Sequence, residues 1–176
     1  LPPCHYTFVF NVQNGKLNLH LTQRSADIAL GVPFNIAAYT LILKLVASQT
    51  KFEVGEFSHQ LVDAHIYCGR DERSEWYQRN LEEFQTRISN VETDQEYLGV
   101  RDWVMANAPE DQDAKPSEDN YGYDHVPGLL KQLSRKSLGR SKLDIINDAT
   151  INNVESCDFE LQDYESHDGL RFSVAE

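Results

Sequence analysis

Residues 23–35 read Gln-Arg-Ser-Ala-Asp-Ile-Ala-Leu-Gly-Val-Pro-Phe-Asn, and the elements on either side can be predicted outward from this stretch. Arg24 and Ser25 place a planar set of donors beside a hydroxyl, a combination that suits a phosphate. Asn35 can donate and accept at once, as recognition of a nucleobase edge requires. Pro33 is predicted to be the first residue of a helix, where its missing N–H costs nothing. The same residue types also fit a polar strand end, a glycine turn and a helix start that bind no ligand.

Two alternating segments lie ahead of this stretch. Residues 6–12 and 16–22 each alternate apolar with polar side chains, which is typical of half-buried strands. Asn14-Gly15 between them is the strongest short signal of a two-residue hairpin turn. We therefore expect an antiparallel hairpin that ends beside Arg24.

Cys4 lies just ahead of the first predicted strand and is the only plausible nucleophile of the chain. A nearby guanidinium favours the reactive thiolate, and Arg24 supplies one if the hairpin brings it back to Cys4. His5 is the immediate neighbour, but successive side chains of an extended chain point apart, so His5 is a poor base for Cys4. This geometry argues against a cysteine–histidine protease. Cys68 and Cys157 have no adjacent positive charge and are expected to be inert.

A helix and a further strand are predicted after the stretch. Residues 34–48 are apolar nearly all round, which predicts a long buried helix. Residues 52–67 contain a strand, and its period of two places Asp63, His65 and Tyr67 on one face. Three polar side chains in a row on an apolar strand indicate the wall of a pocket. The alternative is that His65 and Tyr67 only cap an edge of the core.

Residues 69–124 differ from the rest in composition, since they hold 15 acidic and 6 basic residues in a chain whose net charge is −12. An apolar face follows Ser74, and Thr93 with Glu96 forms a possible capping box, so two amphipathic helices are predicted. Residues 108–120 are acidic and nearly free of large apolar side chains, which predicts a mobile loop. We interpret residues 69–124 as an acidic helical insertion that covers a surface.

Length and composition restrict the class of protein. The 176 residues suffice for one domain with a core. Three cysteines without a Cys-x-x-Cys pair indicate a reducing compartment, so we expect a cytoplasmic location. The apolar run at residues 36–46 contains Lys44 and is too short to span a bilayer, and the first residues do not resemble a signal peptide. The acidic charge argues against general nucleic-acid affinity, and no His, Cys and carboxylate cluster has metal-ligand spacing.

Several motifs together resemble the thymidylate synthase family. The densest are Leu1-Pro2-Pro3-Cys4-His5, the stretch at residues 23–35, and Asp63-Ala64-His65-Ile66-Tyr67. Looser matches are Gln132-Leu133-x-Arg135, Tyr164-x-x-His167-x-Gly169 and Val174-Ala175. The chain resembles the carboxy-terminal part of these enzymes, so we expect a longer amino-terminal part ahead of it. The insertion at residues 69–124 resembles an acid-rich archaeal branch.

The resemblance implies a fold and a domain organisation. The fold class would be α+β, with a large mixed β-sheet and packed helices that include one long buried helix. Residues 1–176 would form a single catalytic domain that contains the insertion. In the family, the sheets of two subunits pack back to back, so a homodimer is implied.

The resemblance also implies an activity, the reductive methylation of dUMP to dTMP with 5,10-methylenetetrahydrofolate, without a metal, a membrane or a nucleic acid. Cys4 would be the catalytic nucleophile on uracil C6. Substrate contacts would come from Arg24 and Ser25 to the phosphate, from Asn35 and the backbone N–H of Asp27 to the base, and from His65 and Tyr67 to the ribose. Ala26 would be a further substrate contact. Folate contacts would come from Asp27, Gly31, Phe34 and Ala175. Supporting roles would fall to His5, in a water network near the base, and to Gln23.

Departures from the family leave alternatives open. Glu176 stands where the family has a small apolar last residue. The general-base glutamate, a folate-stacking tryptophan and further phosphate arginines belong to the family's amino-terminal part. One alternative is a pyrimidine nucleotide hydroxymethylase, although a cytosine-specific version would need an acidic group at Asn35, because cytosine donates where uracil accepts. The other is a non-catalytic nucleotide-binding fragment.

Overall fold

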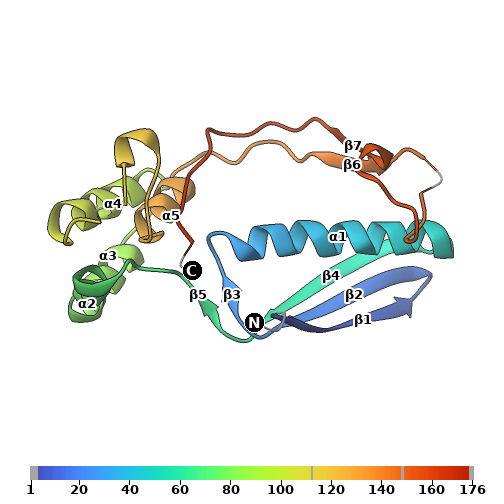
Figure 1. The fold of residues 1–176 in the computed structure, drawn as a ribbon, viewed down its shortest axis with the longest axis horizontal. Helices are drawn as coiled ribbons and strands as arrows, with labels where there is room; N and C mark the ends of the chain where they lie inside the picture. The colour runs from blue at the N-terminus through green and yellow to red at the C-terminus, as the bar shows by residue number, and fades with distance from the viewer. Residues whose placement is uncertain (1–3, 112, 148, 175–176) are drawn as a thin grey trace. The chain divides into compact units, whose positions relative to one another are not determined.

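A mixed sheet and one long helix make up the first part of the fold (Figure 1). The computed structural model describes residues 4–111, 113–147 and 149–174. Its contacts divide these residues into two units. Unit 1 extends to His65 and includes Gly139–Glu165, and unit 2 contains Ile66–Leu138 and the residues from Ser166 onward.

The predicted hairpin is present in unit 1. β1 (His5–Gln13) and β2 (Lys16–Gln23) pair in antiparallel register. Asn14 and Gly15 join them, and both have positive φ, 52° and 77°. Positive φ at both turn residues gives the type I′ turn, whose twist matches that of the paired strands. The hairpin prediction is therefore confirmed.

The sheet is mixed because a third strand joins β2 from the other side. β4 (Glu53–Leu61) pairs with β2 in parallel, which gives the strand order β1-β2-β4. Parallel neighbours need a crossover connection, and α1 (Gly31–Thr50) lies in the crossover between β2 and β4. These elements confirm the α+β class, the mixed sheet and the long helix.

The core of unit 1 lies between this sheet and α1. Its buried side chains come from alternating positions of β2 and from one side of α1: Leu17, Leu19, Leu21, Tyr39, Leu43 and Ala47. The other side of α1 is more accessible, and Phe34 is 74% exposed. In the described part of the chain, α1 is therefore buried along the side that faces the sheet, although its sequence is apolar nearly all round.

The sequence predicted Pro33 as the first residue of this helix. In the structure α1 begins at Gly31, so Pro33 is its third residue. The missing N–H of Pro33 still costs nothing, because the first four N–H groups of a helix have no acceptor within it. With 20 residues, α1 is longer than the apolar run at residues 36–46, and its length and composition would allow it to cross a membrane. Its packing against the leucines of β2 is that of a core helix.

The strand predicted within residues 52–67 is divided in two. β4 ends at Leu61, and β5 (Ala64–His65) leaves the main sheet. It pairs in parallel with β3 (Ala26–Asp27), which follows β2 directly. The chain that leads into α1 is therefore fixed against the chain that carries His65.

A second small ladder completes unit 1. β6 (Lys142–Ile145) and β7 (Phe159–Gln162) pair in antiparallel register, with η2 (Ser156–Asp158) just ahead of β7. Lys44 Nζ donates to Leu143 O at 2.8 Å, so the one charged residue in the middle of α1 is used to hold β6.

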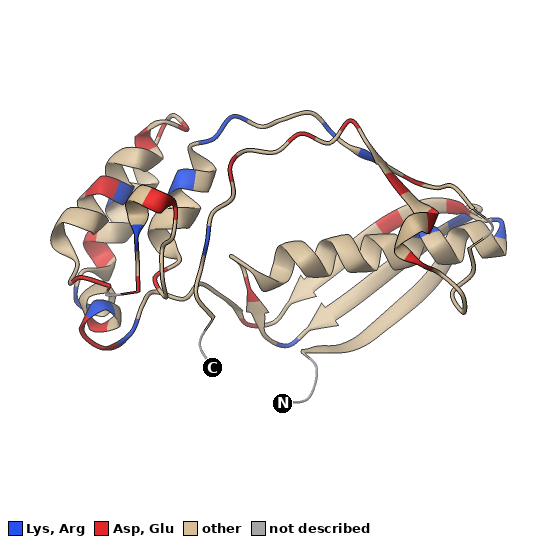
Figure 2. Cartoon of the chain, turned by 45° about the horizontal axis from the view of Figure 1, so that its top comes forward, with Lys and Arg blue, Asp and Glu red and all other residues tan. Residues whose placement is uncertain are grey.

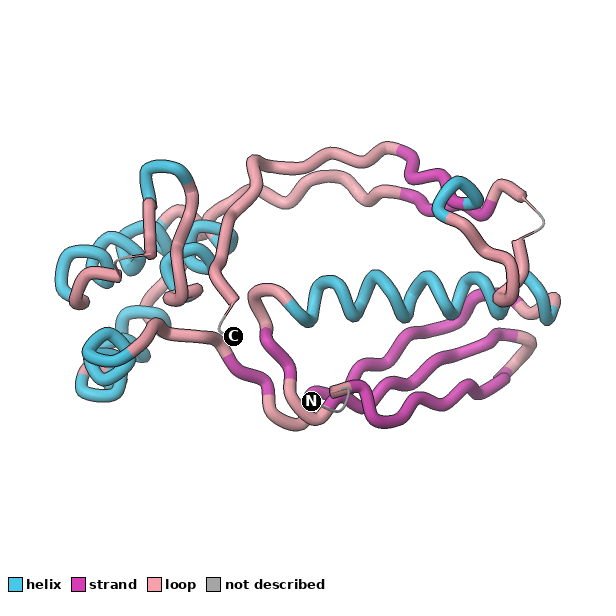
Figure 3. Tube along the Cα trace, viewed as in Figure 1, coloured by secondary structure: helices cyan, strands magenta, loops and turns pink. Residues whose placement is uncertain are grey.

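Unit 2 is helical (Figure 3), and the insertion supplies most of it. Its elements are α2 (Asp71–Arg79), α3 (Leu81–Ser89), α4 (Glu96–Asn107), η1 (Pro116–Glu118) and α5 (Val126–Leu133). Its core cluster consists of Tyr77, Val100, Val104, Val126 and Leu130. The helical nature of the insertion is as predicted, but its first helix is divided at Asn80, whose φ of −112° and ψ of 16° are not helical. That residues 1–176 act as a single catalytic domain stays a prediction.

Several described residues of the acidic segment within residues 108–120 take part in hydrogen bonds to its surroundings, and its mobility stays a prediction. Asp111 Oδ2 accepts from the backbone N–H groups of Tyr123 and Asp124 at 3.0 and 3.1 Å. Asp119 Oδ1 accepts from Lys131 Nζ of α5 at 2.5 Å. Composition alone would count these carboxylates as solvated charges, whereas in the fold they accept hydrogen bonds from the backbone and from α5.

Unit 2 contains many Asp and Glu residues (Figure 2), and five acidic side chains line one cavity of about 440 Å³. They are Asp71, Glu72, Glu110, Asp111 and Asp113, with Arg70 and Arg73 as the basic members of the lining.

Clustered like charges repel, and salt screens the repulsion as the Debye length falls from about 10 Å at 0.1 M to about 3 Å at 1 M. We therefore expect the melting temperature of the protein to rise as salt is added from 0.1 to 1 M. In the double variant Glu110→Gln/Asp113→Asn, which removes two of these charges, the rise should be smaller.

Asp163→Asn/Glu165→Gln is the matched control, because it removes two exposed carboxylates that lie outside the cavity lining. The control should keep the salt dependence of the original protein. If the melting temperatures of all three proteins rise equally with salt, repulsion within this acidic cluster does not cause the salt dependence.

Candidate functional site

The hairpin brings Arg24 back to Cys4. Arg24 N donates to Cys4 O at 2.9 Å, and His5 pairs with Gln23 at the open end of the hairpin. Cys4 is a free, partly exposed thiol. The structure thus places the predicted nucleophile next to the predicted phosphate-binding stretch, as the hairpin argument required.

Gln23 is a buried support of this stretch, with 3% of its surface exposed. Its Nε2 donates to Ser25 O at 2.8 Å, and its Oε1 lies 2.9 Å from His59 Nε2. Burial lowers the pKa of His59, and the nearby His5 adds to this shift. A neutral His59 with a proton on Nε2 donates to Gln23, so the pair fixes the backbone at Ser25. Sequence analysis missed His59, because only the parallel pairing of β2 with β4 brings it there.

Asp27 shapes the entry to α1. Its Oδ1 accepts from Ala29 N at 3.0 Å and from Leu30 N at 3.4 Å, which is the local turn that Asp side chains favour. Ile28 N donates to His65 O at 3.0 Å, which extends the pairing of β3 with β5. The carboxylate predicted to contact ligands therefore also orders the turn that precedes α1.

Asn35 and Asp27 lie on either side of Gly31. A Cβ on Gly31 would lie 3.7 Å from Asp27 Cβ and 3.8 Å from Asn35 Oδ1. Asn35 Oδ1 is buried and has no hydrogen-bond partner among the described residues. A buried polar atom without a partner is costly, so such an atom indicates a position where a ligand donates. The glycine leaves room beside that atom.

The two predicted ribose contacts belong to different units. In unit 1, His65 Nδ1 lies 3.2 Å from Asp63 O and 3.7 Å from Asp63 Oδ2. In unit 2, Tyr67 is 44% exposed, and its ring contacts the ring of His125 edge-on with 5.4 Å between centroids. Because β5 ends at His65, the single strand face predicted for Asp63, His65 and Tyr67 is not formed.

The other cysteines differ from Cys4 in their surroundings. Burial raises the pKa of Cys68, and the neighbouring carboxylate of Asp124 raises it further. Cys157 is exposed, with its Sγ 3.8 Å from Glu155 Oε2. A raised pKa disfavours the thiolate of Cys68, and neither Cys68 nor Cys157 has a positive neighbour in these contacts, which supports Cys4 as the nucleophile.

Some predicted contacts cannot be placed in a site. Phe34 is largely exposed on α1, and Ala175 lies outside the described residues. Within the described part of the chain, no group of three or more His, Cys, Asp and Glu side chains is arranged to hold a metal ion. The absence of a metal from the reaction stays a prediction.

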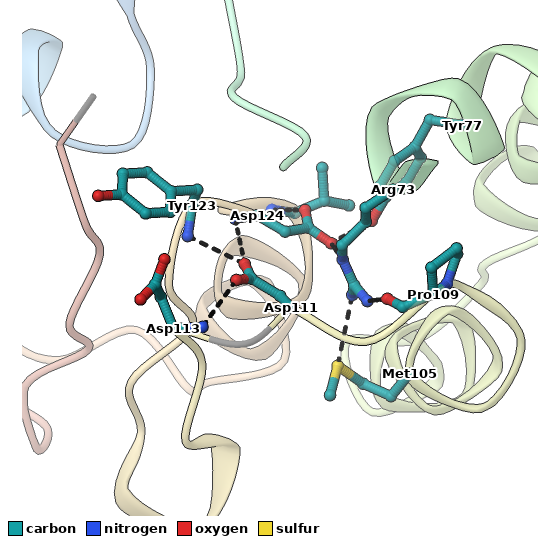
Figure 4. A network of polar contacts seen from close by, with 9 residues as sticks. Arg73, Tyr77, Met105, Pro109, Asp111, Asp113, Tyr123 and Asp124 are labelled. Atoms are coloured by element: carbon teal, nitrogen blue, oxygen red, sulfur yellow. Dashed lines mark hydrogen bonds and ion pairs between the residues drawn. The ribbon is translucent and has the colours of Figure 1, made fainter. Parts of the chain in front are cut away.

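Unit 2 contains a buried polar network that sequence analysis did not find (Figure 4). Arg73 and Asp124 form an ion pair with Nε and Oδ2 2.6 Å apart, and both side chains are buried. Tyr77 OH donates to the same Oδ2 at 2.9 Å. The ion-pair partners are 51 positions apart in the sequence, which explains why no local pattern indicated the pair.

The hairpin and the helix after it carry the cysteine, the arginine and the amide that the sequence predicts to form the site. The family model described as thymidylate synthase matches residues 1–176. The chain therefore belongs to the thymidylate synthase family.

Curated relatives named thymidylate synthase match nearly all of the chain. One from Haloferax volcanii is 54% identical over 176 residues, which are 100% of this chain and 50% of the relative. One from Mycoplasma mobile is 56% identical over 178 residues, covering 99% of this chain and 42% of the relative. One from Staphylococcus haemolyticus is 33% identical over 175 residues, covering 99% of this chain and 38% of the relative. The chain thus spans half or less of the length of these relatives.

Proposed function

We propose that the protein containing this chain is a thymidylate synthase, a methyltransferase that converts dUMP to dTMP with 5,10-methylenetetrahydrofolate. The observation that carries the proposal is the buried Oδ1 of Asn35, which has no hydrogen-bond partner among the described residues and lies beside Gly31, in the same stretch as Arg24. An orphan acceptor needs a donor, and uracil offers its N3–H, whereas N3 of cytosine is itself an acceptor.

In this proposal, the thiolate of Cys4 adds to C6 of the uracil, and the electron pair moves toward C5. C5 then takes the one-carbon unit from methylenetetrahydrofolate, which also supplies the hydride that completes the methyl group. The proton on C5 is lost, and Cys4 leaves C6 when dTMP forms. Arg24 and Ser25 bind the phosphate. The hydrogen bond between the backbones of Arg24 and Cys4 places these residues side by side, which supports one nucleotide contacting both.

The remaining contacts follow from the same assignment. The backbone N–H of Asp27 contacts the base, Ala26 is a further substrate contact, and His65 and Tyr67 bind the ribose hydroxyl. His5 orders water near the base, and Gln23 holds Ser25 in place.

The folate contacts are proposed for Asp27, Gly31, Phe34 and Ala175. Phe34 offers an exposed ring close in sequence to Gly31, where the lack of a side chain leaves space. An aromatic face of this kind suits the flat rings of a folate.

Location and assembly are part of the proposal. Three free cysteines among the described residues support a reducing, cytoplasmic location. A net charge of −12 supports a protein that needs no nucleic acid, and we propose a homodimer without membrane attachment or metal.

Two other functions were open from the sequence. A hydroxymethylase would leave the one-carbon unit unreduced, and a binding fragment would form no product. The names of the relatives support the synthase over both, and the identity of Asn35 argues against a cytosine-specific hydroxymethylase.

The full-length protein, supplied with dUMP and methylenetetrahydrofolate, is expected to form dTMP and dihydrofolate in equal amounts. Dihydrofolate is followed by absorbance and the nucleotide by liquid chromatography with mass detection. Release of 5-hydroxymethyl-dUMP without dihydrofolate would identify the hydroxymethylase instead. Tight dUMP binding without any product would identify a binding protein.

A further inference from the structure

The two ends of the insertion are joined by a short antiparallel ladder directly after Tyr67. His125 N donates to Tyr67 O at 2.9 Å. Cys68 pairs with Asp124 in an antiparallel bridge. The backbone of Tyr67 therefore depends on the position of Asp124 and His125.

Asp124 is 1% exposed, and donors surround its carboxylate (Figure 4). Arg73 Nε and Tyr77 OH donate to Oδ2 at 2.6 and 2.9 Å, and Val126 N donates to Oδ1 at 3.1 Å. Burial raises the pKa of Asp124, and the guanidinium of Arg73 opposes this shift. A buried carboxylate with three donors has one well-defined position, so it can hold the ladder in register.

The rest of the insertion holds this network in place. Arg73 is 5% exposed, and its guanidinium also donates to Pro109 O and lies 3.9 Å from Met105 Sδ. Asp111 Oδ2 accepts from Asp124 N at 3.1 Å. Side chains and backbone from α2, from the end of α4 and from the segment after it thus converge on Asp124.

His125 connects the same ladder to the ring of Tyr67 and to the last part of the chain. Its Nε2 donates to Ser173 O at 3.0 Å, and its ring lies 4.7 Å from that of Phe172. Because the ring of Tyr67 packs edge-on against the ring of His125, an ordered His125 also restrains the side chain of Tyr67.

We propose that Asp124 is a positioning residue of the nucleotide site, which the insertion holds through Arg73 and Tyr77 so that Tyr67 is aligned with the ribose hydroxyl. This inference rests on the proposed function, in which Tyr67 contacts that hydroxyl. It gives the insertion a part in substrate recognition, in place of the surface-covering role that its sequence suggested.

The test compares affinities for dUMP and for 2′,3′-dideoxyuridine monophosphate, which lacks the 3′-hydroxyl, by calorimetry on the full-length protein. One neutral hydrogen bond in a site corresponds to a preference of about three- to tenfold for dUMP. Tyr77→Phe removes one donor from Asp124 and keeps the ring, and Asp124→Asn removes the charge. Tyr97→Phe is the control, since Tyr97 packs against the same core cluster from α4.

The preference for dUMP should fall toward one in Tyr77→Phe and Asp124→Asn, and stay unchanged in Tyr97→Phe. Affinity for the dideoxynucleotide should be the same in all proteins, and adding Tyr67→Phe to either variant should cause no further loss. If Asp124→Asn does not fold, Tyr77→Phe decides the question. Retained preference, or equal weakening of both nucleotides, would overturn the positioning role alone. Failure of the unmodified protein to bind dUMP would overturn this role and the proposed function together.

Discussion

The full-length protein with Cys4→Ser is expected to form no covalent adduct with 5-fluoro-dUMP. The hairpin places Cys4 beside Arg24, whereas Cys68 and Cys157 lie near the carboxylates of Asp124 and Glu155. A serine hydroxyl is far less nucleophilic than a thiolate, so turnover should fall by on the order of a thousandfold or more. Mass spectrometry of the denatured protein measures the adduct, because a covalent bond survives unfolding.

Cys157→Ser and Cys68→Ser are the matched controls for this prediction. Both should form the adduct to the same extent as the unmodified protein. An adduct that persists in Cys4→Ser, on a peptide that contains Cys68 or Cys157, would show that the nucleophile has been assigned to the wrong cysteine.

Short sequence patterns predicted the hairpin and the long helix, because both form between residues that are close in sequence. Asn14-Gly15 between two alternating segments specified the hairpin, because the turn and the strands favour the same twist. The long apolar segment specified α1. Its first residue was misplaced because Pro33 is tolerated at any of the first helical positions, so Pro33 alone does not fix the start.

Periodicity was less informative where a helix is interrupted. The apolar spacing of the insertion continues across Asn80, yet the backbone breaks there and α2 and α3 follow each other as separate helices. A side-chain pattern reports which face is buried, and α2 and α3 both bury residues against the same core. It does not report a single non-helical residue between them.

In the candidate site and the polar network of unit 2, contacts within one hairpin could be predicted, whereas contacts between distant segments could not. The approach of Arg24 to Cys4 could be predicted because one hairpin joins them. The pairing of Gln23 with His59 and that of Arg73 with Asp124 could not, because each joins segments more than thirty residues apart. Contacts of this kind depend on how elements pack, and nothing in the local sequence around Arg73 or Asp124 identifies a buried ion pair.

Replacing Asn35 with aspartate should relax or invert the choice between dUMP and dCMP. Asn35 Oδ1 is buried without a hydrogen-bond partner among the described residues. In the proposed function it would accept from uracil N3–H, and the NH2 group of Asn35 would donate to uracil O4. An ionised aspartate repels O4 but accepts from the amino group of cytosine, and a protonated one can also donate to cytosine N3. A polar mismatch in a desolvated site costs about 1–3 kcal/mol, so the relative preference should change by roughly ten- to a hundredfold.

The ratio of kcat/KM values for the two nucleotides, measured in the full-length protein, tests this expectation. Asn152→Asp introduces the same charge at an exposed position of the loop between β6 and β7, and it should leave the ratio as it is. The comparison separates base reading from a general effect of one more carboxylate in an already acidic protein. If Asn35→Asp lowers both kcat/KM values by the same factor, then Asn35 does not read the base, and its buried oxygen must be satisfied in another way.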